Sequence, residues 1–222
     1  MPSGPALFPL PEGSRHPLRR IVLLTGPSGS GKSSLVRRLG LPTVALDDFY
    51  LDVDHPGLPH RFGIVDWDDP ASWDAGGAAE ALATLCRTGE VELPVYDIPT
   101  SRRTGARRLV LDGERIIVAE GIFAAELVSR LAEEQLLADA ICLARPRVAT
   151  FWFRLLRDVA ESRKPPLTLV RRGLALWRAE PALIARWVGL GCRAVSPRAA
   201  ERVIADLGAR PPRGGPRGGM AG

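Results

Sequence analysis

The sequence has few cysteines and no long apolar run, and both features restrict the class of protein. Cys86, Cys142 and Cys192 are the only cysteines among 222 residues, and their spacing fits neither a disulfide framework nor a metal site. We therefore expect reduced cysteines in a cytoplasmic protein. No apolar run approaches the roughly 20 residues that cross a bilayer, and the first 20 residues are interrupted by basic side chains. We expect neither a membrane span nor a secretory signal.

Lysine is also scarce. Only Lys32 and Lys164 occur, so arginine supplies nearly all the positive charge behind the net charge of +5. With heavy use of Ala, Gly and Pro, this bias is typical of a GC-rich genome and does not by itself indicate a polyanionic partner. We do not expect nucleic-acid binding, because residues 66–74 are acidic and the sequence shows no second base-stacking module.

The remaining composition, with 45% hydrophobic and 25% charged residues, is that of an ordinary globular protein. Residues 1–18 contain five prolines and no periodic pattern, so we predict a disordered lead-in. Residues 19–208 alternate strand-like apolar runs with helical patterns, which predicts one α/β domain with a parallel sheet flanked by helices on both faces. The Arg/Gly/Pro-rich tail, residues 209–222, is expected to be disordered. The oligomeric state stays open, with a homo-oligomer as one alternative.

The strongest motif is Gly26-Pro27-Ser28-Gly29-Ser30-Gly31-Lys32-Ser33-Ser34. It follows the apolar run 21–24, a predicted strand, and precedes the helix-compatible segment 33–39, as a phosphate-binding P-loop requires. Glycines let successive N–H groups face one concavity, and the helix N-terminus favours bound phosphate. Lys32 would reach the β- and γ-phosphates, and the Ser33 hydroxyl would ligate Mg²⁺. We predict an ATP site with the phosphate contacts Gly26, Ser28, Gly29, Ser30, Gly31, Lys32, Ser33 and Ser34.

Carboxylates follow two further predicted strands. Residues 43–46 lead into Asp47 and Asp48, and residues 116–119 lead into Glu120. Ligands of open α/β sheets gather at the carboxyl ends of strands, and P-loop proteins place a magnesium-positioning carboxylate there. Alternation along a strand would direct Asp47 and Asp48 in opposite directions, so that at most one faces the phosphates. A helix cap or an Asx-turn is the alternative for this pair.

The segments between these strands are less specific. Residues 51–70 form a predicted surface loop that leads into the stretch 66–74, where two tryptophans lie among carboxylates. This stretch fits a sugar or base pocket, a helix N-terminus capped by Asp69, or both. Pro94 suits an edge strand, and Asp112-Gly113 predicts a hairpin. The remaining predicted elements are the helices 71–87, 123–136 and 197–207 and the strands 91–98, 107–111, 115–119 and 138–143.

A predicted helix beyond residue 145 contains Arg154 and Arg157, which lie three residues apart and so share one face. Two guanidinium groups on one face suit the stabilisation of charge on a transferring phosphoryl group. Ordinary Arg–Asp pairing on a solvated surface is the alternative.

Taken together, these motifs resemble the uridine kinase (uridine-cytidine kinase) family, which is related to phosphoribulokinase and pantothenate kinase. The resemblance covers about residues 20–165. It implies a P-loop NTPase fold with a β-hairpin insertion on the substrate side, a helical lid at about residues 145–165, and an ATP- and Mg²⁺-dependent kinase. Its parts, beside the P-loop, are Asp47-Asp48-Phe49-Tyr50, Trp67-Asp68-Asp69-Pro70, Pro94-Val95-Tyr96-Asp97, Glu120-Gly121-Ile122 and Arg154-Leu155-Leu156-Arg157-Asp158.

The resemblance also implies roles for single residues. Asp47 would be the general base that takes the proton of the attacking hydroxyl. Asp68 would bind a ribose diol, and Tyr96 would line a nucleoside pocket. The implied catalytic set is Asp47, Lys32, Arg154 and Arg157, with both arginines in the lid. The implied acceptor set is Asp47, Asp68, Tyr96 and Arg102, and the magnesium-associated set is Ser33, Asp47 and Glu120.

Two features depart from the family pattern. The family usually has a histidine shortly after its Tyr-Asp pair, and none occurs between Tyr96 and Arg102. Residues 161–166 also lack the glycine expected after the lid arginines.

A nucleoside 5′-hydroxyl is the expected acceptor. The alternatives are another small hydroxyl substrate, such as a vitamin or sugar phosphate, and a nucleotide-dependent switch or ATPase.

Overall fold

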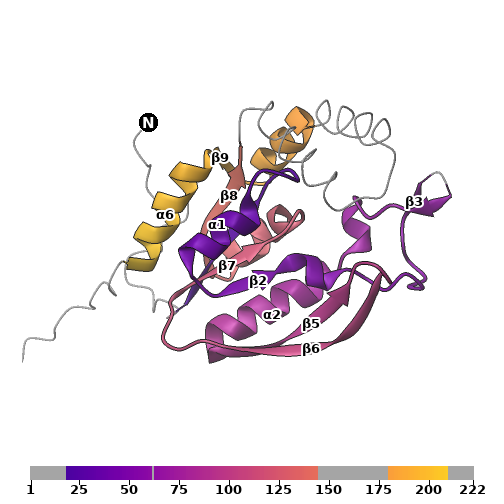
Figure 1. Cartoon of the computed structure of the whole chain (residues 1–222), viewed down its shortest axis with the longest axis horizontal. Coiled ribbons are helices and arrows are strands. Elements are labelled where there is room, and N and C mark those ends of the chain that lie inside the picture. The colour runs from indigo at the N-terminus through magenta and orange to yellow at the C-terminus, as the bar shows by residue number, and fades with distance from the viewer. Residues whose placement is uncertain (1–18, 62, 145–179, 210–222) are drawn as a thin grey trace, which may run out of the picture.

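The computed structural model describes residues 19–61, 63–144 and 180–209, which fold around a five-stranded parallel sheet (Figure 1). The strand order is β2-β7-β1-β8-β9, and every neighbouring pair is parallel. The predicted parallel sheet is confirmed, with β1 at its centre. The strands are β1 (Arg20–Thr25), β2 (Thr43–Ala45), β7 (Ile116–Glu120), β8 (Leu137–Leu143) and β9 (Arg193–Val195).

The central strands β1, β7 and β8 are mostly apolar because both faces of the sheet are covered. Side chains of β1 alternate between two cores: Ile21 and Leu23 enter one, and Val22 and Leu24 enter the other. The second core is closed by Leu35 of α1 and Ile204 of α6. The helices on this face are α1 (Lys32–Leu39) and α6 (Pro197–Ala209), of which α6 confirms the predicted helix 197–207.

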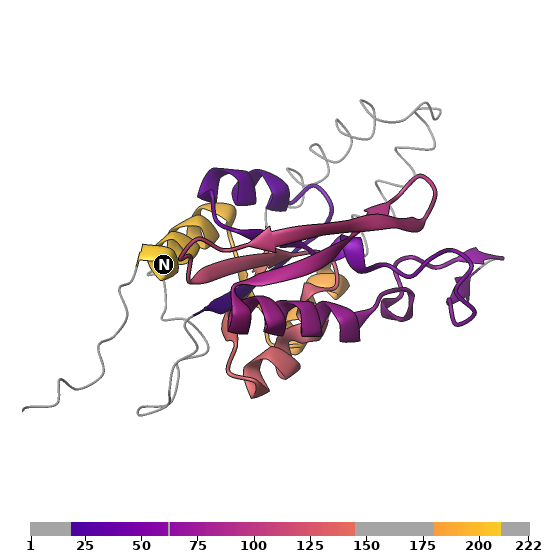
Figure 2. The same ribbon diagram turned by 90° about the horizontal axis from the view of Figure 1, so that it is seen from below.

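The opposite face is covered by helices that pack on Ile21 and Leu23. Leu82 of the long helix on this face and Trp187 of the helical residues 180–189 are both buried there. The two views in Figures 1 and 2 show the sheet between these two layers of helices. This layer also contains the helical segments α2 (Ala75–Thr88), η3 (Ala124–Leu127) and α3 (Val128–Glu133).

The predicted hairpin across Asp112-Gly113 is wrong. The strand β6 (Arg102–Val110) pairs antiparallel with β5 (Glu90–Asp97), and these two form a separate sheet beside α2 (Figure 2). The next strand, β7, instead enters the central sheet between β2 and β1. Its residues are buried except at the last position, and such a strand needs a covered parallel sheet rather than a solvated hairpin. The hairpin insertion therefore exists, but β5 and β6 form it.

Several predicted boundaries also change. A short 3-10 helix, η2 (Pro70–Ser72), precedes α2, so the predicted helix 71–87 is interrupted; Asp69 caps the first and Asp74 the second. The predicted helix 123–136 is likewise divided into η3 and α3.

The structure adds two features that the sequence did not predict. One is the strand β9, and the other is a small hairpin within the predicted loop 51–70, formed by β3 (His60–Arg61) and β4 (Ile64–Val65). The lead-in 1–18, the lid 145–165 and the tail from residue 210 lie outside the described residues.

The three cysteines are free, as expected, and the structure places all of them in the buried interior. Burial raises the pKa of the Cys142 thiol to about 11 and that of the Cys86 thiol to about 12. Such thiols stay protonated at neutral pH and are poor nucleophiles. Within the described part of the chain, no helix has the length and apolar character needed to cross a membrane.

Candidate active site

The P-loop joins the central strand β1 to α1. Gly29 and Gly31 adopt φ angles of 83° and 93°, a left-handed conformation that glycine reaches without steric cost. Gly31 is the N-cap of α1, no side chain caps this helix, and its first turn has no acidic residue. The N-terminus of α1 therefore presents its N–H groups and its positive dipole end without a carboxylate from its own first turn.

A cavity of about 530 Å³ opens at the P-loop and at the carboxyl ends of β2 and β7. This volume lies within the usual range of small-molecule sites. The cavity brings the predicted phosphate loop together with Asp47 and Glu120, while Ser30 is buried and does not line it. The lining residues are Gly26, Ser28, Gly29, Gly31, Lys32, Ser33, Ser34, Asp47, Tyr50, Glu120 and Ile122.

Ser33 and Glu120 form a pair of oxygen ligands at the start of α1. The Ser33 hydroxyl donates to Glu120 Oε1 at 3.2 Å. Burial raises the pKa of Glu120, and the charge of Asp47 raises it further, whereas Lys32 and the Ser33 hydrogen bond lower it. Mg²⁺ is usually held by one or two carboxylates together with substrate phosphates and water. This donor set fits that ion, and the described residues contain no cluster of three or more His, Cys, Asp or Glu side chains that would hold a metal alone.

Asp47 and Asp48 lie in the 3-10 helix η1 (Leu46–Phe49), so the predicted strand alternation does not apply to them. The edge strand β2 ends at Ala45, and the chain turns before the two carboxylates. The turn still separates their environments. Asp47 lines the cavity, whereas Asp48 Oδ2 lies 3.7 Å from Arg107 Nη2 of β6.

The pKa of Asp47 is raised above that of an ordinary aspartate. Desolvation by the surrounding protein atoms is the main cause and Asp48 adds to it, while Lys32 and a hydrogen bond from the Ile122 backbone act in the opposite direction. Asp47 remains accessible to solvent through the open cavity. A carboxylate with a raised pKa beside a phosphate site has the properties of a candidate general base.

Gly121 allows the Asp47 turn to approach the end of β7. A Cβ atom at this position would lie 2.8 Å from Leu46 Cβ and 3.1 Å from Asp47 Oδ1. The first distance is too short for two carbon atoms, so a larger residue would displace η1 and the carboxylate with it. The glycine after Glu120 is therefore required by close packing against the candidate base.

Replacing Gly121 with alanine is expected to lower kcat and to destabilise the fold by about 1–3 kcal/mol, the usual cost of an added methyl group in a well-packed site. Steady-state kinetics and chemical denaturation measure the two effects. Gly105→Ala in β6 is the matched control, because a Cβ there meets no atom within 4 Å. Equal kinetics and stability of the two variants would contradict this role of Gly121.

Aromatic residues gather beside the cavity around Tyr50. The ring centroid of Tyr50 lies 5.7 Å from those of Trp67 and Tyr96, and 5.9 Å from that of Phe123. Trp73 is instead part of the core, 4% exposed, and its Nε1 donates to Leu46 O at 2.7 Å. Of the two tryptophans predicted for a pocket, Trp67 contacts Tyr50 directly, whereas Trp73 reaches this cluster only through Phe123, at a centroid distance of 5.6 Å.

The other predicted acceptor residues do not line the cavity. Asp68 is exposed next to Trp67, and the exposed Arg102 Nη1 lies 2.9 Å from Asp54 Oδ2. Arg154 and Arg157 lie outside the described residues. Sequence reasoning gave no role to Tyr50, although it belongs to the motif around Asp47. It also missed the Ile122 backbone contact, for which a sequence provides no signal.

Comparisons with known proteins give relatives over part of the chain, and no family model matches it. A uridine kinase from Borreliella burgdorferi is 28% identical over 151 residues, which cover 65% of this chain and 69% of that protein. The inorganic pyrophosphatase TTM2 from Arabidopsis thaliana is 33% identical over 106 residues, 47% of this chain but 15% of that protein. The chain is therefore similar in sequence to uridine kinases. This confirms the resemblance predicted from the motifs.

A solved structure with a similar fold is a putative fructose transport system kinase from Silicibacter sp. TM1040. It matches this chain with a TM-score of 0.55 at 24% identity, over 78% of this chain and 88% of that one. At this identity the match shows the fold alone. The predicted α/β fold, with a P-loop after the central strand of a parallel sheet flanked by helices, is therefore confirmed.

Proposed function

We propose that this protein transfers the γ-phosphoryl group of ATP to a hydroxyl group of a small molecule, and that the acceptor is the 5′-hydroxyl of a nucleoside. The observation that carries the proposal is the joining of the P-loop, Lys32, Asp47 and Glu120 at one cavity. Relatives named uridine kinases match about two thirds of the chain, which supports a phosphotransferase with an alcohol as acceptor.

The proposed chemistry is mainly positioning and neutralisation of charge. The N–H groups of the P-loop and the Lys32 ammonium hold the triphosphate. Asp47 accepts the proton of the acceptor hydroxyl as its oxygen forms a bond to the γ-phosphorus and the bond to the departing ADP breaks. Ser33 and Glu120, with Asp47 nearby, would hold Mg²⁺, which neutralises phosphate charge when bound. Arg154 and Arg157 are proposed to contact the transferring group from the lid.

The aromatic cluster supports a ring-containing acceptor. Tyr50 lines the cavity, and Tyr96 and Trp67 contact its ring, so a flat base has aromatic surface to pack against. Asp68 is proposed to bind the ribose diol, although its exposed position requires the acceptor to reach beyond the cavity. Arg102 belongs to the same proposed acceptor region at the tip of the β5–β6 hairpin.

A second acceptor class is favoured by the missing base-reading histidine. The hairpin tip, residues 98–101, carries Ile-Pro-Thr-Ser, and Thr100 is engaged with Asp97 through a hydrogen bond of 2.5 Å. A site without a polar contact to the base edge discriminates poorly between ring systems. A vitamin or sugar derivative with a free hydroxyl is therefore the alternative acceptor.

The test is ATP turnover with and without a panel of nucleosides, sugars and vitamins, in the presence of magnesium. We expect ADP formation to depend on one nucleoside and a phosphorylated nucleoside to accumulate in equal amount. Turnover that depends on a sugar or vitamin would move the assignment to the alternative acceptor. Turnover unchanged by every acceptor would contradict the kinase proposal and favour a nucleotide-dependent switch or ATPase.

A further inference from the structure

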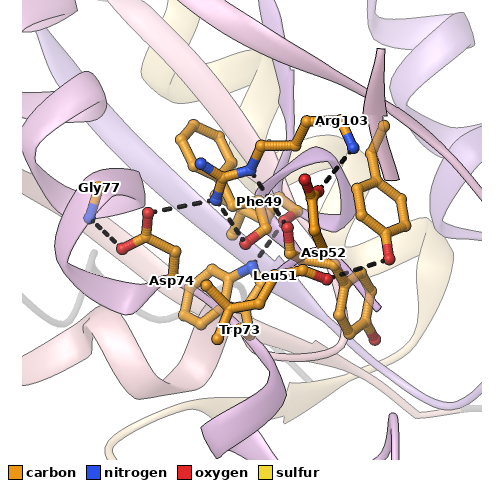
Figure 3. A network of polar contacts seen from close by, with 10 residues as sticks. Phe49, Leu51, Asp52, Trp73, Asp74, Gly77 and Arg103 are labelled. Atoms are coloured by element: carbon orange, nitrogen blue, oxygen red, sulfur yellow. Dashed lines mark hydrogen bonds and ion pairs between the residues drawn. The ribbon is translucent and has the colours of Figure 1, made fainter. Parts of the chain in front are cut away.

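The segment 46–53, which carries Asp47, is held on one side by the residues that lead into α2 (Figure 3). Trp73 Nε1 donates to Leu46 O at 2.7 Å, and the Asp74 N–H donates to Phe49 O at 3.0 Å. The Leu51 N–H donates to Ser72 O, also at 3.0 Å. These bonds attach both ends of the η1 turn to the start of α2.

The same segment is held on its other side by the β5–β6 hairpin. The Tyr96 hydroxyl donates to Leu51 O at 3.2 Å, and the Val53 N–H donates to Ser101 O at 2.9 Å. The backbone N–H of Arg103 donates to Asp52 Oδ1 at 2.8 Å. The hairpin that is proposed to face the acceptor is thus bonded to the chain that carries the candidate base.

The Arg103 side chain reaches both sides at once, as Figure 3 shows. Its Nε donates to Tyr50 O at 3.2 Å, and its Nη2 contacts Phe49 O at 3.4 Å and Asp74 Oδ2 at 3.2 Å. The other oxygen of Asp74 accepts from the Gly77 N–H at 2.8 Å and so caps α2. Arg103 therefore joins the hairpin, the Asp47 turn and the N-terminus of α2 in one set of contacts.

This arrangement depends on the shape of guanidinium more than on its charge. The Arg103 side chain is 35% exposed and that of Asp74 is 34% exposed, and an ion pair so open to water adds little stability. The planar fork, in contrast, presents several donors in fixed directions, which a lysine ammonium on a flexible stem does not. The contacts fix geometry at Phe49 and Tyr50, two and three residues beyond Asp47.

We propose that Arg103 is a positioning residue: it fixes the η1 turn so that Asp47 and the Tyr50 ring keep their places in the cavity while the acceptor binds against the hairpin. The expected effect on kcat rests on the proposed function, whereas the contacts between Arg103 and the η1 turn do not depend on it. Small displacements of a reacting group are costly, since a shift of about 1 Å can lower the rate by a factor of roughly 10².

The experiment compares Arg103→Ala and Arg103→Lys with Arg108→Ala as the matched control. Arg108 lies on the same strand, pairs with Glu90 and does not line the cavity. Two readouts are required: steady-state kinetics with the acceptor found in the panel, and hydrogen–deuterium exchange of the whole protein resolved by mass spectrometry. Binding of a non-hydrolysable ATP analogue is measured alongside them.

We expect Arg103→Ala to lower kcat by a factor of about 10 to 10², with affinity for the ATP analogue changed less than about twofold. Exchange should increase in residues 46–53 and not in β1 or the P-loop. Arg103→Lys should recover part of the rate at most, and Arg108→Ala should match the wild type. Asp74→Asn keeps a capping side chain but loses the ion pair, so it should shift exchange in the same segment by less.

Wild-type kcat in Arg103→Ala would overturn the proposal. A lower kcat with unchanged exchange in residues 46–53 would also overturn it, because Arg103 would then act on the acceptor directly. If the wild type transfers phosphate to no acceptor, the kinase proposal fails, but the exchange experiment still decides the link between Arg103 and the Asp47 turn. Should Arg103→Ala not fold, Arg103→Lys and Asp74→Asn provide the same two tests.

Discussion

Lys32→Ala is expected to abolish phosphoryl transfer, with kcat/KM reduced by a factor of at least about 10³ while the protein stays folded. The Lys32 side chain lies at the cavity and donates from Nζ to Gly26 O at 2.9 Å, within the P-loop itself. A bound triphosphate would replace Gly26 O as the partner of the Lys32 ammonium group. Lys32 also lowers the pKa values of Asp47 and Glu120, so its loss leaves both carboxylates easier to protonate. Residual activity should therefore shift to higher pH.

Arg37→Ala is the matched control for this charge change. Arg37 is exposed in the last turn of the same helix, α1, away from the cavity. This substitution removes one positive charge but leaves the phosphate loop unchanged, so kcat/KM should stay near that of the wild type. Ser33→Ala should abolish turnover as Lys32→Ala does. Circular dichroism checks folding, and wild-type kcat/KM in Lys32→Ala would remove the P-loop assignment.

The parts of the fold that the sequence predicts are those set by local patterns. The P-loop glycines, the buried strand before them and the helix after them each have a local signature, and all three occur as predicted. The pairing of β7 does not follow from local signals. Asp112-Gly113 is a good turn sequence, but burial of Ile117 and Val118 on opposite faces of the sheet decides the partner strand.

The strand β9 was missed because its stability comes from a contact across the sheet. It is three residues long, and Arg193 at its start pairs with Asp139, a fully buried carboxylate on β8. A charge next to a short apolar run weakens a strand prediction unless its partner is known. Buried Asp139 needs such a partner, and only the folded sheet brings the two together.

The candidate site likewise combines features that local sequence patterns predict with contacts that only the folded chain establishes. The residues of the P-loop and the carboxylates after β2 and β7 meet at the cavity, as parallel strands that end at one edge must. The hairpin contacts depend on register, which the sequence leaves open. Arg102 and Arg103 are neighbours, yet Arg102 pairs with exposed Asp54 while Arg103 turns to the Asp47 segment. In a strand, a shift of one residue changes the face, so the sequence alone does not indicate which of the two arginines contacts the Asp47 segment.

Asp47→Asn is expected to lower kcat by a factor of about 10² to 10⁴, the usual contribution of a positioned general base. Asp48→Asn should cost much less, because Asp48 faces Arg107 rather than the cavity. The two variants remove the same charge one residue apart, so each is the control for the other. Steady-state kinetics at saturating magnesium compare them, with circular dichroism to confirm folding.

The pH dependence of the wild type supplies a second criterion. A general base acts only when deprotonated, so kcat/KM should rise with pH through the pKa of Asp47 in the free enzyme. Because that pKa is raised, the rise should lie above the range of an ordinary aspartate. It should be lost in Asp47→Asn and kept in Asp48→Asn. A dead Asp48→Asn beside a mild Asp47→Asn would place the base one residue further on, and equal modest losses would mean that neither residue is the base.

Asp47→Asn should also make the ligand-free protein more stable at neutral pH. Because folding raises the pKa of Asp47, the folded state favours the protonated carboxyl. The resulting gain in stability is fully present below the pKa of the unfolded state and is lost as the pH rises through the pKa of the folded state. Asparagine stays neutral throughout, so the Tm difference between variant and wild type should be larger at about pH 7 than at about pH 4. Asp48→Asn should show no such gain. A lower Tm of Asp47→Asn at neutral pH would mean that Lys32 and the Ile122 backbone outweigh the desolvation of this carboxylate.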